Sequence, residues 1–297
     1  MITVMTLIAR RFNRQYTSAC RVHLAVDLYR AAQLLPSTFT SSVMAQQHQL
    51  QLHGRCAEEF PHCILTATDK KGRPRIVRLL GCAVSRPTAH ASEADVCERL
   101  ELAKAHEEGT PVAHIKLIDV DLNPEDSCCS TKHGAGVYRA LLMPRCVCAV
   151  SAQPQLRQMV MARGGARFVQ AVEYMHSKRH VHIYIKGADV FVDADGNWFL
   201  GDFGSTVVIG DPVHSYTQCF YRNDILRQPA QPAFDWYMLA VMLAVELHKE
   251  KWREQLLDGD CVTDSKLCAA ASAATLEGLK DNLQLAMERG QIADDAS

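Results

Sequence analysis

The sequence lacks both an excess of charge and a long apolar run. Its 297 residues carry 32 Lys and Arg against 33 Asp and Glu, a formal net charge of −1. That balance gives no sign of a nucleic-acid partner or a membrane-surface partner. The longest apolar stretch, WYMLAVMLAVEL at 236–247, is too short to span a bilayer and contains Glu246. It therefore predicts a buried helix, and we expect neither a nucleic-acid nor a membrane partner.

The cysteines lack the spacing of a metal site or of a disulfide framework. There are twelve of them, but they are scattered and no CxxC occurs. The closest pairs are Cys128–Cys129 and Cys146–Cys148. Free thiols in a reducing compartment are the simplest interpretation. We therefore predict an intracellular, cytoplasmic location.

Acidic residues are missing from the first part of the chain, where none precedes Asp27. Basic residues are present there, at Arg10, Arg11, Arg14 and Arg21. The segment is not a secretory signal, because the arginines follow the apolar stretch. A surface helix is the favoured interpretation, and a mitochondrial transit peptide is the minor alternative. Residues 1–55 are expected to form a basic N-terminal extension, and the sequence leaves open whether they belong to the fold.

The next part of the chain favours strands. The stretch 62–84 contains two apolar runs around Gly72 and Pro74, which is typical of a hairpin. Residues 92–109 have the periodicity of one amphipathic helix, and 112–122 and 136–144 indicate two more strands. We expect 56–143 to form a strand-rich lobe with one helix.

After Pro144 the pattern becomes helical. Helical periodicity runs through 155–179, two short strands follow, and then come a polar segment at 204–233 and the buried helix at 235–247. No internal repeat occurs. The expected fold class is α+β in two lobes, the second spanning 144–290, with a cleft between them.

Several short motifs appear in a fixed order in the second lobe. YMHSK at 174–178 leads to His182, then Lys186, then DGNWFL, then Asp202-Phe203-Gly204, and Asp235 opens the buried helix. This order resembles the protein kinase family, specifically its Ser/Thr branch, in which HRDxKxxN precedes DFG. The resemblance is specific over about 140–248 and thinner upstream. It implies a bilobal kinase-like fold, with a C-lobe trimmed because only about 50 residues follow the buried helix.

The resemblance also implies site residues and cofactors. Asp189 and Asp202 would hold Mg²⁺, while Arg78, Lys186 and Met143 of the hinge segment ALLMP would contact ATP. Four of these positions have a plainer interpretation, and Lys186 could simply pair with either aspartate. Asp202 could be a turn cap, Asp189 a solvated loop acid, and Arg78 a surface charge.

Departures from the family pattern fall at the reacting positions. HIY stands where HRD is expected, so Tyr184 occupies the position of the catalytic base, and Ile183 replaces the arginine. A phenol is protonated at neutral pH and donates where an acceptor is needed. Arg78 replaces the usual lysine, and the expected helix partner is Glu98 or Glu101.

Two further segments depart from the family. Where a glycine-rich lid would cover the phosphates, residues 55–63 read RCAEEFPHC, with Glu58 and Glu59 and no glycine. An APE triplet is missing, and YRNDIL at 221–226 is the nearest equivalent. Together the departures predict a pseudokinase that binds protein, with Mg²⁺ and ATP only if any nucleotide is bound. The alternative is a divergent, active Ser/Thr kinase acting on a protein substrate. The sequence does not indicate an oligomeric state.

Overall fold

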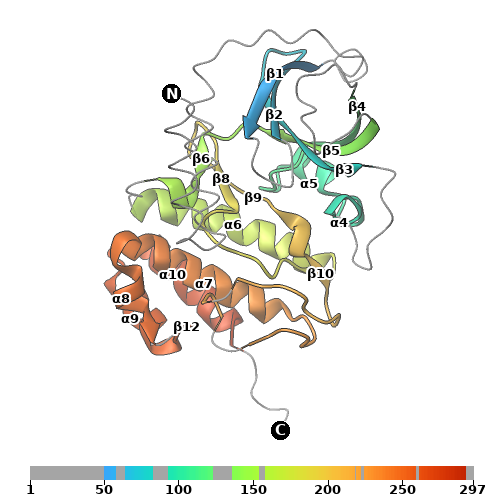
Figure 1. The fold of residues 1–297 in the computed structure, drawn as a ribbon. Helices are drawn as coiled ribbons and strands as arrows, with labels where there is room; N and C mark the ends of the chain where they lie inside the picture. The colour runs from blue at the N-terminus through green and yellow to red at the C-terminus, as the bar shows by residue number, and fades with distance from the viewer. Residues whose placement is uncertain are drawn as a thin grey trace, which may run out of the picture.

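The computed structural model describes residues 50–57, 64–82, 93–122, 136–153, 158–217, 219–221, 224–258 and 261–291. A five-stranded antiparallel sheet forms the first lobe, in the order β1-β2-β3-β5-β4. Its strands are β1 (Leu50–Ala57), β2 (Ile64–Asp69), β3 (Pro74–Cys82), β4 (Lys116–Leu122) and β5 (Gly136–Pro144). Figure 1 shows this sheet above the helical second lobe. The hairpin expected around Gly72 is the β2–β3 turn, where Gly72 has a φ of +73°.

Strand β1 crosses the boundary that the sequence suggested for the first lobe. Leu50 pairs with Asp69 of β2, so the sheet already includes residues 50–55, which we had placed in the extension. Alternating polar residues in QLHGRCA gave little apolar signal for a strand. Its pairing with the apolar strand β2 supplies the missing stabilisation. Residues 58–63, with Glu58 and Glu59, lie outside the described residues, as do residues 1–49.

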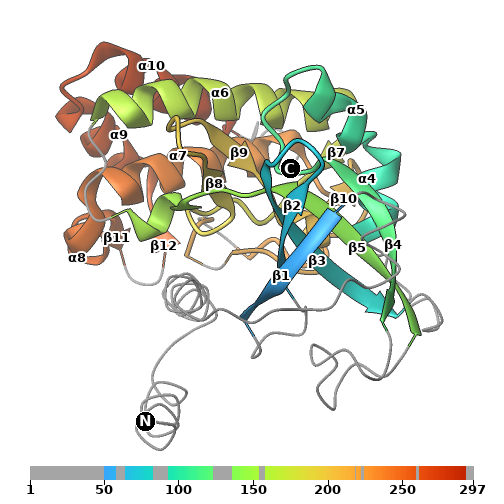
Figure 2. The same ribbon diagram turned by 90° about the horizontal axis from the view of Figure 1, so that it is seen from above.

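The single helix predicted over 92–109 is wrong, since two short helices occupy this range. They are α4 (Glu93–Arg99) and α5 (Leu102–Glu107). Glu101 separates them in the left-handed region, with a φ of +49°. The break shifts the helical phase, so Leu102 and Ala105 are buried in α5, whereas Ala103 is only half-buried. Figure 2 shows α5 beside one end of α6.

Three long helices build the second lobe: α6 (Gln158–Ser177), α7 (Pro232–His248) and α10 (Glu277–Arg289). Helix α10 packs against both α6 and α7. The shorter helical segments are η1 (Val150–Ala152), η2 (Phe203–Ser205), η3 (Lys249–Lys251), α8 (Trp252–Leu256) and α9 (Asp264–Ala273). No helix among the described residues is both long enough and apolar enough to cross a membrane.

Short strands arrange the loops between α6 and α7. Strands β6 (Cys148–Ala149), β8 (Val190–Val192) and β9 (Trp198–Leu200) form one sheet, β7 (His180–Val181) pairs with β10 (Val207–Val208), and β11 (Leu257–Asp258) pairs with β12 (Cys261–Val262). The β8–β9 hairpin brings the segment before it and the segment after it side by side. The loops 182–189 and 201–206 therefore lie next to each other.

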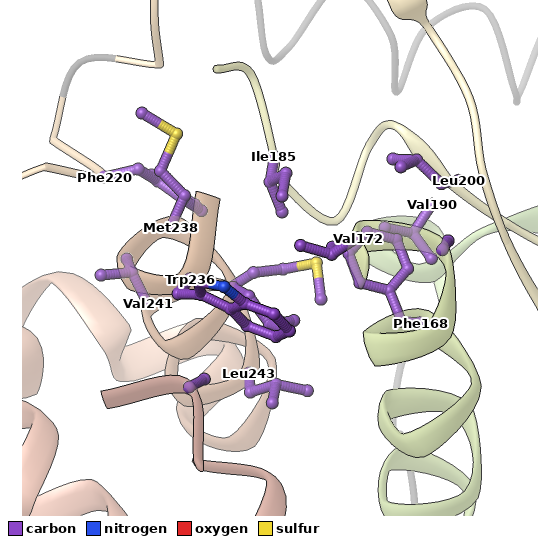
Figure 3. Packing of buried hydrophobic residues seen from close by; sticks show 14 of the residues in the cluster. Phe168, Val172, Ile185, Val190, Leu200, Phe220, Trp236, Met238, Val241 and Leu243 are labelled. Carbon is purple, nitrogen blue, oxygen red and sulfur yellow. The ribbon is translucent and has the colours of Figure 1, made fainter. Parts of the chain in front are cut away.

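The main core lies between α6, α7 and the β8–β9 hairpin, as Figure 3 shows for Phe168, Val172, Leu200 and Trp236. Helix α7 is apolar on all sides, which is typical of a helix enclosed by the protein. Gly164 lets α6 approach the sheet closely, because a Cβ at this position would overlap the indole of Trp198. This closely packed core thus supports the loops 182–189 and 201–206.

Candidate functional site

The loop that follows β7 is anchored from below by the buried carboxylate of Asp235. Its oxygens accept hydrogen bonds from the backbone N–H groups of His182 and Ile183, both at 2.8 Å. The ring Nε2 of His176 lies 2.9 Å from the same carboxylate. Ile183 is fully buried at a φ of +66°, a strained conformation for a β-branched residue. Asp235 holds this strained backbone in place.

His182 links the loop to the Asp202 turn. Its Nε2 lies 3.0 Å from the carbonyl oxygen of Gly201, and its ring packs edge-on against Phe203 with the centroids 5.6 Å apart. Burial lowers the pKa of His182, against the opposing effect of Asp235. A neutral imidazole bonded to a backbone carbonyl connects two loops and is not placed to exchange protons with a substrate.

Tyr184 is half-buried and its aromatic ring faces Lys186. The ammonium Nζ of Lys186 lies 3.7 Å from the ring centroid, a close cation–π contact. Lys186 also lies 3.5 Å from Oδ2 of Asp189. The position expected for a proton-accepting carboxylate therefore carries an aromatic ring that engages the neighbouring lysine.

Asp189 is buried, so the solvated loop acid considered from the sequence is excluded. Its backbone accepts a hydrogen bond from Gly201 N–H at 3.0 Å, which ties the two loops together. Burial raises the pKa of its carboxyl well above the usual range, and the nearby Asp202 adds to this effect against Lys186. Two carboxyl groups that disfavour each other's ionisation thus share this site.

Asp202 lies in the left-handed region at a φ of +60°, and its side chain makes no capping hydrogen bond to η2. The turn-cap alternative is therefore excluded. Oδ1 instead accepts a hydrogen bond from Nη2 of Arg78 at 3.2 Å. Burial raises the pKa of Asp202, but Arg78 and His182 outweigh it and lower the pKa below its ordinary value.

Arg78 is half-buried within the site, with its side chain 16% exposed, and is not a surface charge. Its second nitrogen, Nη1, donates to Oε1 of Glu93 on α4 at 3.1 Å. Burial lowers the pKa of Arg78, yet the carboxylates of Glu93 and Asp202 raise it above its ordinary value. Burial raises the pKa of Glu93, in opposition to Arg78. One guanidinium thus contacts a carboxylate from each of two elements.

The expected partners of Arg78 were wrong. Glu98 pairs with Arg139 at 2.6 Å, and Glu101 pairs with Lys178. Glu98 lies five residues after Glu93, on another side of the helix. Glu93 could have been found from the sequence, because Val96, Cys97 and Leu100 follow at helical spacing and share its buried face.

Two other expected site residues have clear places in the fold but no demonstrated role. Met143 pairs with Ile76 at the end of β5, and its side chain is buried in the main core. Its contact with a nucleotide stays a prediction. In the segment expected to replace the APE triplet, Tyr221 packs edge-on against Phe234 and Tyr237. This contact fixes the segment to α7.

The two aspartates do not fit a resident Mg²⁺ as they are arranged. Asp202 already contacts Arg78, and Asp189 faces Lys186. Oδ2 of Asp189 accepts no hydrogen bond from the described residues. Within those same residues, no group of three or more His, Cys, Asp or Glu side chains could hold a metal ion. The assignment of Asp189 and Asp202 as metal ligands therefore stays a prediction.

Comparisons with known proteins identify similar folds. The serine/threonine-protein kinase US3 homolog of cercopithecine herpesvirus 9 (strain DHV) is 25% identical over 108 residues, and the match spans 33% of this chain and 31% of that relative. The kinase domain of a Toxoplasma gondii specific rhoptry antigen superimposes with a TM-score of 0.53 at 18% identity, covering 80% of this chain and 73% of that one. No family model matches the sequence. The chain has a protein-kinase-like α+β fold, with a strand-rich first lobe and a helical second lobe, as the sequence predicted.

Proposed function

We propose that this chain is a pseudokinase: a protein-kinase-like domain that acts by binding another protein, with weak or no ATP binding. The contact between Tyr184 and Lys186 carries the proposal. At the place where phosphoryl transfer needs a group to orient the acceptor hydroxyl, the chain offers a phenol ring covered by an ammonium group. Neither group is a proton acceptor at neutral pH.

The energetic argument concerns the missing base. Loss of a general base alone typically costs roughly 10²–10⁴ in rate. Phosphoryl transfer depends mainly on positioned charges around the phosphates. Here Arg78, which replaces the expected lysine, is already bonded to Glu93 and Asp202. The costs fall in separate parts of the site, so we expect them to compound.

A divergent, active Ser/Thr kinase is the second candidate, and a specific observation favours it. The frame of the loop is complete, since Asp235, His182 and Phe203 hold it as a rigid unit. Lys186, Asp189 and Asp202 all lie within this region. A largely dissociative transition state tolerates a poor base. The viral relative is named a serine/threonine-protein kinase, but the match spans less than a third of its length.

The first experiment measures transfer. The purified chain is incubated with ATP, Mg²⁺ and a generic protein substrate, beside the variant Asp202→Ala. We expect no phosphoryl incorporation above that of the variant. Incorporation by the wild type that is lost in Asp202→Ala would overturn the pseudokinase proposal in favour of the active kinase.

The second experiment measures nucleotide binding by thermal shift. We expect millimolar ATP, with or without Mg²⁺, to leave the melting temperature unchanged. A rise that depends on Mg²⁺ would favour the active kinase, because ligand binding to the folded state raises the melting temperature. Binding to a protein partner in the cytoplasm then remains the function we propose.

A further inference from the structure

We propose that the Arg78 guanidinium is the built-in cation of this site, which fastens helix α4 to the Asp202 turn without metal or nucleotide. A divalent ion and Arg78 would then compete for the same carboxylate. The inference rests on the proposed function, because it explains how a domain that does not depend on ATP keeps its two lobes joined here.

The contacts form a closed triangle between three elements. From β3, Nη1 of Arg78 donates to Glu93 of α4 at 3.1 Å, and Nη2 donates to Asp202 at 3.2 Å. The third side runs from the backbone N–H of Phe203 in η2 to Oε1 of Glu93, at 3.2 Å. When any one of the three contacts breaks, the other two still connect β3, α4 and the Asp202 turn. The three elements therefore resist local opening together.

The shape of arginine explains why this residue can close the triangle. A guanidinium is planar and points two nitrogens along separate directions, whereas an ammonium is a compact point charge. Here Nη1 and Nη2 each serve a different carboxylate. A lysine at position 78 would have one nitrogen for both. The replacement therefore changes the connectivity of the site, not only the length of one side chain.

Burial makes the clamp selective against an added cation. The side chains of Arg78 and Glu93 are 16% and 8% exposed, and Asp202 is 39% exposed, so an ion can reach Asp202 only from its open side. An ion bound there would lie within a few ångströms of the guanidinium, in surroundings that screen charge poorly. Asp202 has one strong cation partner already, and repulsion opposes a second.

The test uses hydrogen exchange in the full chain, followed over 93–99 and 202–206. We expect Arg78→Gln to speed exchange in both segments by at least about tenfold, since breaking these partly buried ion pairs leaves Glu93 and Asp202 without their cation. Arg139→Gln is the matched control. It removes an exposed pair to Glu98 of the same helix and should leave exchange within about twofold of wild type.

A second variant separates the clamp from general unfolding. In Arg78→Lys we expect faster exchange at 202–206 alone, reversed by Mg²⁺ with ATP, while exchange in the wild type does not respond to Mg²⁺ or to Mg²⁺ with ATP. Slower exchange in the wild type on adding Mg²⁺ would overturn the proposal. So would an Arg78→Lys variant that matches the wild type. Phosphoryl transfer by the wild type would contradict the proposed function. It would not change what the exchange measurement says about the clamp, so the two failures can be told apart.

Discussion

The two sides of the loop at 182–189 differ in how closely they keep a kinase-like arrangement. Beneath the loop, the buried Asp235 holds two backbone N–H groups and His176, and His182 packs on Phe203. Above it, Tyr184 covers the base position and Arg78 contacts two carboxylates. The contacts beneath the loop fix its backbone, whereas above the loop a phenol ring and a guanidinium stand where the kinase resemblance leads one to expect a carboxylate and a lysine.

This difference separates folding from chemistry. A frame residue such as Asp235 stabilises the fold directly, so replacing it costs stability. Tyr184 and Arg78 contribute through contacts with neighbouring charged side chains. A protein that binds without catalysing needs the frame, but it does not need a proton-accepting carboxylate at the position of Tyr184. The following experiments test that separation, starting from the largest expected effect.

Removing the anchor should damage the frame most. Asp235→Ala leaves the N–H groups of His182 and Ile183 without an acceptor and releases the strained backbone of Ile183. We expect the free energy of unfolding to fall by about 3–5 kcal/mol, because buried donors lose a charged partner. Urea denaturation measures this loss, and Asp195→Ala in an exposed turn is the control. A loss of less than about 1 kcal/mol would show that Asp235 does not hold the loop backbone in place.

Acid should weaken the fold through His114, which is 2% exposed and whose Nδ1 has no hydrogen-bond partner among the described residues. Burial lowers its pKa from 6.5 to about 4, with a smaller effect from His106. The unfolded chain binds the proton first, so this contribution is present above pH 6.5 and disappears as the pH falls toward 4. The shift corresponds to about 3 kcal/mol.

The measurement compares urea unfolding of the wild type and His114→Gln at pH 7 and at pH 4.5. We expect the variant to lose less stability than the wild type between these two pH values, because glutamine does not titrate. Equal losses in the two proteins would show that His114 is not a source of acid sensitivity.

Close packing behind the site can be tested at Gly164. In Gly164→Ala the new methyl group overlaps the Trp198 indole, so α6 or the β9 strand must shift. Overpacking of this kind typically costs about 1–3 kcal/mol. Thermal unfolding followed by tryptophan fluorescence reports both the stability and the position of the indole. Gly196→Ala would be a poor control because of its positive φ, whereas Gly278→Ala meets only an ordinary contact with Ala162. Unchanged stability in Gly164→Ala would mean that the core around Trp198 can accommodate the added methyl group.

The smallest effect is expected above the loop. Tyr184→Leu removes the ring beneath Lys186, a contact worth about 1 kcal/mol, whereas Tyr184→Phe keeps it. Chemical denaturation should therefore separate Leu from Phe by roughly that amount. A loss of stability as large as that of Asp235→Ala would show that Tyr184 stabilises the fold as strongly as the residues beneath the loop do. Equal stability of the two variants would show that the ring does not stabilise Lys186.

The sequence by itself predicted the two-lobe α+β architecture and most of the order of elements, apart from the start of β1 and the break between α4 and α5. Apolar periodicity carried these predictions, whereas the resemblance to protein kinases pointed to His182, Lys186, Asp189, Asp202 and Asp235. Helices α6 and α7 and the β2–β3 hairpin lie close to where the patterns placed them.

Only the tertiary structure decided the partners. Arg78 and Glu93 lie on different elements, and Asp202 is 124 residues from Arg78 in the sequence. Helical periodicity places Glu93 on the buried face of α4, but its distance to Arg78 of β3 depends on how the helix is oriented. The break at Glu101 and the ring of Tyr184 beneath Lys186 depend likewise on the surrounding packing. Local patterns fix which elements form, and long-range contacts fix which charges meet.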